Sequence, residues 1–135
     1  MKKFLVLLLL PITLVLFFSC SHAENGNTRE TTDYLNISAQ EAKEIMDTET
    51  GYVILDVRTE EEFAEGHIPG AILIPDYEIE AKAEQILTDK NQLILVYCRS
   101  GRRSKIASEA LVSLGYTNIR EFGGIIDWPY ETVID

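Results

Sequence analysis

Apolar residues along the chain fall into two patterns that alternate from one segment to the next. Mainly apolar runs at 52–57, 71–74 and 93–97 have the length of strands and are rich in β-branched residues, so they predict buried strands. Residues 34–37 and 118–122 are further strand candidates. Between these runs, apolar residues recur three or four positions apart, which is typical of the inner face of a helix. The helical positions are Ala42, Ile45 and Met46, then Ile79, Ala83, Ile86 and Leu87, and last Ile106, Ala110, Leu111 and Leu114.

Polar residues and glycines mark where these helices begin and end. Ser38 and Glu41 have the spacing of a capping box at the start of the first helix, and Gly51 is predicted to close that helix. A short helix opens over 59–63, and Gly115 suits the C-terminal cap of the last helix. Because strands and helices alternate, the sequence predicts an α/β domain with a mainly parallel central sheet and helices on both faces.

The first 23 residues have the layout of an export signal. Lys2 and Lys3 precede an apolar run over 4–18, which is shorter than the about 20 apolar residues that a membrane-spanning helix needs. Cleavage after Ala23 makes residues 1–23 a signal peptide. Alternatively, residues 1–19 are a lipoprotein signal and Cys20 carries a lipid anchor. Either outcome predicts an exported protein that is periplasmic or attached to the cell envelope.

The remaining chain divides into a tether and one acidic domain. Residues 24–33 are polar without apolar periodicity, which predicts a flexible tether, and residues 34–135 are enough for one hydrophobic core. After residue 23 the chain holds ten basic and 22 acidic residues, a net charge of −12 with His neutral. This charge disfavours nucleic acid as a partner. We expect a monomer.

The most reactive feature of the sequence is Cys98, at the junction between the apolar run 93–97 and the last helix. Arg99, Arg102 and Arg103 surround it, and cations and helix N-termini lower the pKa of a thiol. The pattern therefore predicts a nucleophilic thiolate, against the alternative of an inert buried thiol. Once the signal is cut or Cys20 is acylated, Cys98 has no cysteine partner for a disulfide, and the scarcity of Cys and His argues against a metal site.

Three separated motifs resemble the rhodanese family of sulfurtransferases. Residues 98–103, Cys-Arg-Ser-Gly-Arg-Arg, look like the six-residue active-site loop of that family. Upstream, Asp-Val-Arg at 56–58, Glu-Phe at 62–63 and Gly-His-Ile-Pro-Gly-Ala at 66–71 match its other hallmark, and Gly-Gly at 123–124 followed by Trp128 resembles its C-terminal signature. The resemblance implies a three-layer rhodanese-like α/β fold over 34–135 and no cofactor or metal. It implies that Cys98 is catalytic and that the substrate is bound by Arg99, Ser100, Gly101, Arg102 and Arg103.

The other motif residues are predicted to support the fold. The carboxylates Asp56 and Glu62 have no partner base in the motif, and Arg58 and Glu62 are spaced to pair on one helical turn. His67 lies in a glycine- and proline-bounded segment that predicts a rigid turn instead of a Cys–His dyad. The residues Gly123, Gly124 and Trp128 are predicted to serve in turns and packing, with Trp128 also a candidate border of the thiol pocket.

Together, resemblance and chemistry predict an exported sulfurtransferase. Cys98 takes a sulfane sulfur from a donor such as thiosulfate and passes it to a small thiophilic acceptor or an acceptor protein. A non-enzymatic persulfide carrier or binding module is the main alternative. A Cys-based phosphatase or arsenate reductase is a weaker one, because the tyrosine-phosphatase pattern requires Arg at the sixth position after Cys, where this chain has Ser104.

Overall fold

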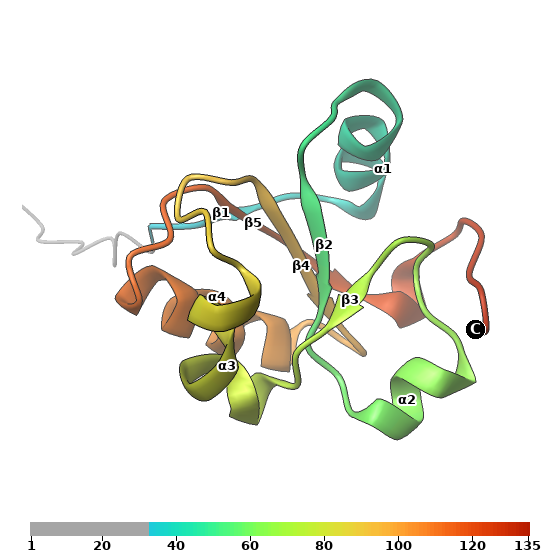
Figure 1. Cartoon of the computed structure of the whole chain (residues 1–135). Coiled ribbons are helices and arrows are strands. Elements are labelled where there is room, and N and C mark those ends of the chain that lie inside the picture. Colours follow the sequence, from blue (N-terminus) through green and yellow to red (C-terminus); the bar gives the residue numbers. More distant parts are fainter. Residues whose placement is uncertain (1–32) are drawn as a thin grey trace, which may run out of the picture.

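The computed structural model describes residues 33–135, which form a five-stranded, fully parallel sheet (Figure 1). The strand order is β1-β5-β4-β2-β3, so β4 is the central strand. The predicted signal (1–23 or 1–19), the candidate lipidation site Cys20 and all but the last residue of the predicted tether lie outside the described residues. The strands are β1 (Leu35–Asn36), β2 (Val53–Asp56), β3 (Ile72–Leu73), β4 (Ile94–Cys98) and β5 (Ile119–Gly124).

Helices cover both faces of this sheet, which confirms the predicted three-layer fold. The helix α1 (Ala39–Thr48) packs on one face, and α3 (Ile79–Ile86) and α4 (Arg102–Ser113) pack on the other (Figure 1). The short α2 (Glu60–Glu65) lies in the crossover from β2 to β3, and single 3₁₀ turns follow β3 and β5 (Asp76–Glu78 and Ile125–Asp127). Among the helices of residues 33–135, none has the length and apolar character needed to span a bilayer.

The central strand β4 explains the uninterrupted apolar run in the sequence. All five of its residues are buried, and alternate side chains enter two separate cores. Ile94, Val96 and Cys98 face α3 and α4, whereas Leu95 and Tyr97 face α1. A strand covered on both faces needs apolar side chains at every position. The same alternation places the Cys98 side chain under α4.

The helix starts agree with the sequence prediction, and one helix end differs from it. Both halves of the Ser38–Glu41 capping box form, and Ser38 Oγ accepts the Glu41 N–H at 3.1 Å. The helix α1 ends at Thr48 with Glu49 as its cap, so Gly51 does not close the helix and lies in the following turn with a φ of 77°. Gly115 follows α4 with a φ of 93°, as its predicted capping role requires.

Candidate active site

The loop between β4 and α4 folds back over the last residue of the strand. Cys98 ends β4, the side chains of Arg99 and Ser100 are exposed, and Gly101 precedes the first turn of α4 with a φ of 102°. This left-handed conformation favours glycine because it lacks a Cβ. It directs the Gly101 N–H toward Cys98 Sγ, at 3.0 Å. No side chain within residues 33–135 caps the start of α4, so the positive end of the helix faces the loop.

The Cys98 thiol is free and almost fully buried, with 1% of the residue exposed. Besides the Gly101 N–H, its sulfur contacts Ser104 Oγ at 3.4 Å, and the thiol hydrogen is placed to donate to that oxygen. If the thiol loses its proton, the Gly101 N–H and the Ser104 hydroxyl are both positioned to donate to the sulfur anion. Donors aimed at a developing anion in a water-poor site are an effective form of electrostatic stabilisation.

The Ser104 hydroxyl connects the sulfur to a buried carboxylate. Ser104 Oγ lies 2.5 Å from Glu121 Oε1, which also accepts the Gly123 N–H at 2.8 Å. Longer contacts join Ser104 Oγ to the carbonyl oxygens of Gly101, at 3.1 Å, and Gly123, at 3.4 Å. A hydroxyl has one hydrogen to donate, and the short contact assigns it to Glu121. Cys98, Ser104 and Glu121 therefore form a continuous hydrogen-bonded chain, called here the thiol–carboxylate chain.

Sequence reasoning missed both Ser104 and Glu121 as parts of this site. Ser104 mattered only as the position where a phosphatase has Arg, and Glu121 was one residue of a predicted strand. A signal was present, because Glu121 is two residues after the apolar Ile119 and therefore points to the same side of β5. That side faces α4 and is buried, so an acidic residue there is unusual.

The three arginines of the loop have different roles in the structure. Arg103 forms a two-pronged ion pair with Glu62 of α2, with Nη1–Oε2 at 2.7 Å and Nη2–Oε1 at 2.8 Å. These hydrogen bonds lower the pKa of Glu62 to about 2, and the same pairing raises the pKa of Arg103. The predicted Arg58–Glu62 pair is wrong for this reason. Arg99 and Arg102 are exposed, and neither forms an ion pair within residues 33–135.

Asp56 and Arg58 form a buried ion pair at the end of β2. Arg58 Nη2 donates to Asp56 Oδ2 at 2.7 Å and to the Gly66 carbonyl at 2.7 Å. The Arg58 guanidinium also lies over the Tyr97 ring, 5.7 Å from its centroid. Burial and the nearby Asp56 carboxylate raise the pKa of Tyr97, whose hydroxyl accepts the Ile68 N–H at 3.1 Å. These contacts hold the segment from Gly66 to Ile68 against the end of β2 and β4.

His67 makes its contacts in the same segment and away from the thiol. Its Nδ1 lies 3.0 Å from the Phe63 carbonyl oxygen, and its Nε2 lies 3.1 Å from Asp135 Oδ2. The ring stacks on Phe63 with 3.7 Å between centroids, and the backbone pairs with Val133 as an antiparallel bridge. His67 therefore ties the last described residues to α2, and it is not part of a dyad with Cys98.

Gly124 has no side chain, and this leaves room for the backbone of the Cys98 loop. A Cβ at this position would lie 2.1 Å from the Arg99 carbonyl oxygen and 2.5 Å from the Ser100 Cα. The pairing of β4 with β5 is irregular between Val96 and Cys98, and such bulges redirect the chain near functional sites. The Arg99 carbonyl also accepts the Ile126 N–H at 3.2 Å. The end of β5 is thus the platform on which the loop rests.

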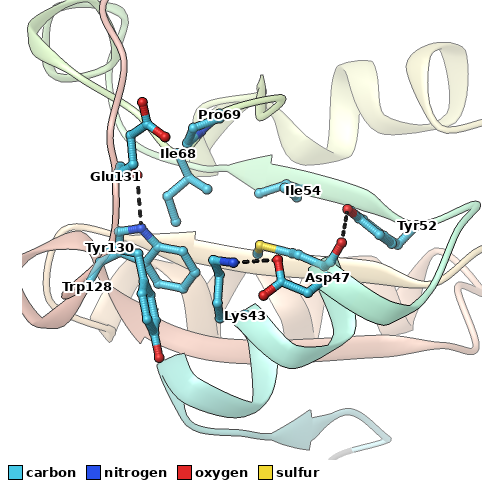
Figure 2. Close-up of a pocket in the computed structure, with 10 residues that line it drawn as sticks. Lys43, Asp47, Tyr52, Ile54, Ile68, Pro69, Trp128, Tyr130 and Glu131 are labelled. Atoms are coloured by element: carbon cyan, nitrogen blue, oxygen red, sulfur yellow. Dashed lines mark hydrogen bonds and ion pairs between the residues drawn. The ribbon is translucent and has the colours of Figure 1, made fainter.

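A hollow lies on the face of the sheet that α1 covers, opposite the Cys98 side chain (Figure 2). It has a volume of about 270 Å³, with Ile54, Ile68 and Trp128 among its apolar walls and a Lys43–Asp47 ion pair at its edge. Trp128 packs in the core on the α1 side, against Phe122, whereas Cys98 faces α4. Trp128 therefore serves in packing, as expected, and it lies in the core on the other face of the sheet from Cys98.

Comparison with known proteins agrees with the sequence motifs. The sequence matches the family described as "Rhodanese-like domain" over residues 38–129. It is 40% identical over 73 residues to the thiosulfate sulfurtransferase PspE of Escherichia coli, covering 54% of this chain and 70% of that protein. It is 36% identical over 88 residues to a sulfurtransferase of Allochromatium vinosum, covering 64% and 79% of the two chains. Some other curated relatives are much longer, and the match covers as little as 20% of one of them.

Solved structures show the same relationship in three dimensions. The structure described as "rhodanese with anions from E. coli" superposes with a TM-score of 0.58 at 36% identity, covering 62% of this chain and 99% of that one. The thiol loop, the Asp56–Arg58 pair and the paired glycines before Trp128 all lie within the matched residues 38–129.

Proposed function

Because the chain belongs to the rhodanese-like family, we propose that it is a sulfurtransferase in which Cys98 carries the transferred sulfur as a persulfide. The observation that carries this proposal is the hydrogen bond from the Gly101 N–H to Cys98 Sγ, at 3.0 Å. A loop that aims a backbone donor at a free sulfur stabilises negative charge on that sulfur. The names of the curated relatives support the same chemistry.

In the first half of the reaction, the Cys98 thiolate attacks the outer sulfur of a donor such as thiosulfate. A bond forms between Cys98 Sγ and that sulfur, the sulfur–sulfur bond of the donor breaks, and sulfite leaves with the bonding electron pair. The negative charge that remains lies on the terminal sulfur of the persulfide. The Gly101 N–H and the positive end of α4 favour this charge.

In the second half, a nucleophilic acceptor attacks the terminal sulfur of the persulfide. The persulfide bond breaks, and its electron pair returns to Cys98 Sγ as the thiolate. The acceptor is a small thiophilic molecule or a partner protein. The reaction is neither oxidising nor reducing overall, so the protein needs no redox cofactor for it.

The three loop arginines have different electrostatic roles. Arg99 and Arg102 are exposed, and their charges attract a dianionic donor to the loop. Arg103 is held by Glu62, so it links α4 to α2 and its charge is largely balanced. A phosphatase reaction is disfavoured because Ser104 occupies the position of the phosphate-binding Arg and is itself buried.

We further propose that the protein is exported, on the basis of the basic and apolar pattern of its first 23 residues. Intact mass analysis of protein isolated from the cells that make it tests this proposal. The expected chain starts at Glu24, or at Cys20 with an added lipid. Recovery of a chain that starts at Met1 would contradict export by either route.

The sulfurtransferase proposal is tested by loading and by turnover. Intact protein incubated with thiosulfate should gain the mass of one sulfur atom, and it should then form thiocyanate from cyanide over many cycles. A carrier would gain the sulfur without this turnover. Cys98→Ser should lose both, because an alcohol does not form a persulfide, while its thermal stability stays close to that of the wild type. Sulfur transfer by the Cys98→Ser variant would rule out Cys98 as the carrier.

A further inference from the structure

The proposed sulfur chemistry does not use the buried carboxylate of Glu121. Only 2% of this residue is exposed, and no ion pair within residues 33–135 includes it. Burying an unpaired carboxylate is unfavourable unless hydrogen bonds or a proton stabilise it. Its partners are the Ser104 hydroxyl, at 2.5 Å, and the Gly123 N–H, at 2.8 Å.

The sheet geometry places Glu121 on the same face as the reactive sulfur. In the β4–β5 register Glu121 is opposite Val96, and Val96 and Cys98 both point toward α4. Ser104, in the first turn of α4, lies between the two side chains and contacts both. The strands β4 and β5 lie next to each other along α4 (Figure 1). The three groups come from three different elements, so their alignment is a property of the tertiary fold.

The hydrogen positions in the thiol–carboxylate chain follow from counting the hydrogen-bond donors and acceptors of its three groups. A thiol donates one hydrogen, a hydroxyl donates one and accepts others, and an ionised carboxylate only accepts. The resting arrangement is therefore Cys98 S–H to Ser104 Oγ, and Ser104 O–H to Glu121 Oε1. Every donor points toward the carboxylate, which is the arrangement needed to move a proton in that direction.

We infer that Glu121 takes up the proton of Cys98 through Ser104 and so generates the thiolate. The inference rests on the proposed function, in which this thiolate attacks the sulfur donor. As the Cys98 S–H bond breaks, its proton passes to Ser104 Oγ, while the Ser104 hydroxyl proton passes to Glu121 Oε1. The products are a thiolate, a hydroxyl that now donates to the sulfur, and a neutral carboxylic acid. No co-reactant is needed, and the net charge of the three groups is unchanged.

This sharing of one proton also removes an electrostatic conflict. A thiolate and a carboxylate joined by one hydroxyl in a buried site would repel each other. With the proton on Glu121, the site holds a single negative charge, on sulfur, both as thiolate and as persulfide. The proton returns to Cys98 only when the resting thiol forms again. Glu121 is thus a positioning and proton-holding residue that acts through Ser104.

Other charged groups surround the thiol–carboxylate chain, but within residues 33–135 none of their side chains forms a hydrogen bond with Cys98 Sγ or Glu121. Arg103 is paired with Glu62 and also lies near Cys98 and Asp76. Tyr34, packed in the same core, has a raised pKa from burial and from the nearby carboxylates. The charged and titratable neighbours are Tyr34 before β1, Glu62 of α2, Asp76 after β3, Arg99 of the loop, and Arg102, Arg103 and Glu109 of α4.

Alkylation by iodoacetamide tests this inference without a sulfur donor, because its rate follows the fraction of Cys98 present as thiolate. The rate is measured against pH for the full wild-type chain and for Glu121→Gln, which keeps the side-chain shape but does not take up the proton. We expect the variant to react at least tenfold more slowly at pH 7 and to reach the wild-type rate at high pH. Removing a merely repelling carboxylate would do the opposite and raise the rate at pH 7.

Three further variants make the result specific. Ser104→Ala interrupts the chain and should reproduce the shift of Glu121→Gln, whereas Ser104→Thr keeps the hydroxyl and should restore the wild-type profile. Glu44→Gln removes one exposed acidic charge from α1, on the opposite face of the sheet, and should leave the profile unchanged. Circular dichroism and thermal unfolding confirm that each variant is folded. A Glu121→Gln profile that coincides with the wild type, or that moves to lower pH, would overturn the inference.

Sulfur loading from thiosulfate, measured on the same samples, separates the two hypotheses. Normal loading of the wild type together with an unshifted Glu121→Gln alkylation profile would refute the proton transfer alone. A shifted alkylation profile in a protein whose wild type gains no sulfur would refute the sulfurtransferase proposal alone.

Discussion

Replacing Gly124 by Ala should displace the Cys98 loop and strongly reduce sulfur transfer. Gly124 has a φ of −130° and a ψ of 153°, which alanine adopts freely, so any effect must come from contact. The added Cβ would lie 2.1 Å from the Arg99 carbonyl oxygen and 2.4 Å from its carbonyl carbon. Ordinary contact begins at 3.4 Å, so the loop backbone must retreat by at least the difference, 1.3 Å.

The expected loss follows from the size of this movement. The loop carries the Gly101 N–H that now lies 3.0 Å from Cys98 Sγ, and a retreat of this size breaks that hydrogen bond. Misplacing a reacting group by about 1 Å reduces catalysis by roughly 100-fold. The clash should also destabilise the fold by about 1–3 kcal/mol, as overpacking generally does. We therefore expect kcat/KM for thiosulfate and cyanide to fall by about two orders of magnitude in a folded protein.

A matched variant separates loop displacement from lost stability. Gly115 lies beyond the far end of α4 with a φ of 93°, and a Cβ there meets no atom within 4 Å. Gly115→Ala should cost about 1–3 kcal/mol through backbone strain and leave kcat/KM unchanged. Steady-state kinetics and urea unfolding are measured for both variants. Wild-type kinetics in Gly124→Ala would show that the loop does not depend on this contact, and an equal activity loss in Gly115→Ala would assign the effect to stability.

Three other substitutions test single interactions. Arg102→Ala should raise the KM for thiosulfate a few-fold at low salt and have no effect at high salt, because salt screens the attraction between an exposed cation and the donor. An unchanged KM at low salt would exclude Arg102 from donor binding. Glu62→Gln should lower stability at pH 7 by about 1 kcal/mol, as seen by urea unfolding. The pKa of Glu62 is about 2 in the folded protein, which is lower than in the unfolded chain. The ionised carboxylate therefore stabilises the fold at any pH above its pKa in the unfolded chain. The difference in the free energy of unfolding between wild type and variant should vanish as the pH falls toward 2. A pH-independent difference would contradict this linkage. Asp56→Ala should destabilise by about 3–5 kcal/mol, since it leaves the buried Arg58 unpaired, and a loss below 1 kcal/mol in thermal or urea unfolding would contradict that account.

Local sequence patterns are enough to predict the order and type of the elements and the place of the thiol. Local periodicity carries this information, because a strand buried on both faces needs an unbroken apolar run and a surface helix needs an apolar stripe. The run that became β4 therefore predicted both its central position and the end at which Cys98 lies. The capping box at Ser38 and the glycine after α4 were also readable, since both depend on residues within one helical turn.

Which distant side chains meet at the thiol depends on the packing of the whole fold. Arg103 pairs with Glu62, 41 positions away, and the helical spacing that suggested Arg58 instead carried no information about how α2 and α4 approach each other. Ser104 meets Glu121, 17 positions later, only because β5 lies beside β4 in one particular register. Side-chain type and local spacing predict what a residue is able to do. Strand order, register and helix packing decide which partner it finds, because they bring together segments whose separation along the chain is unrelated to their separation in space.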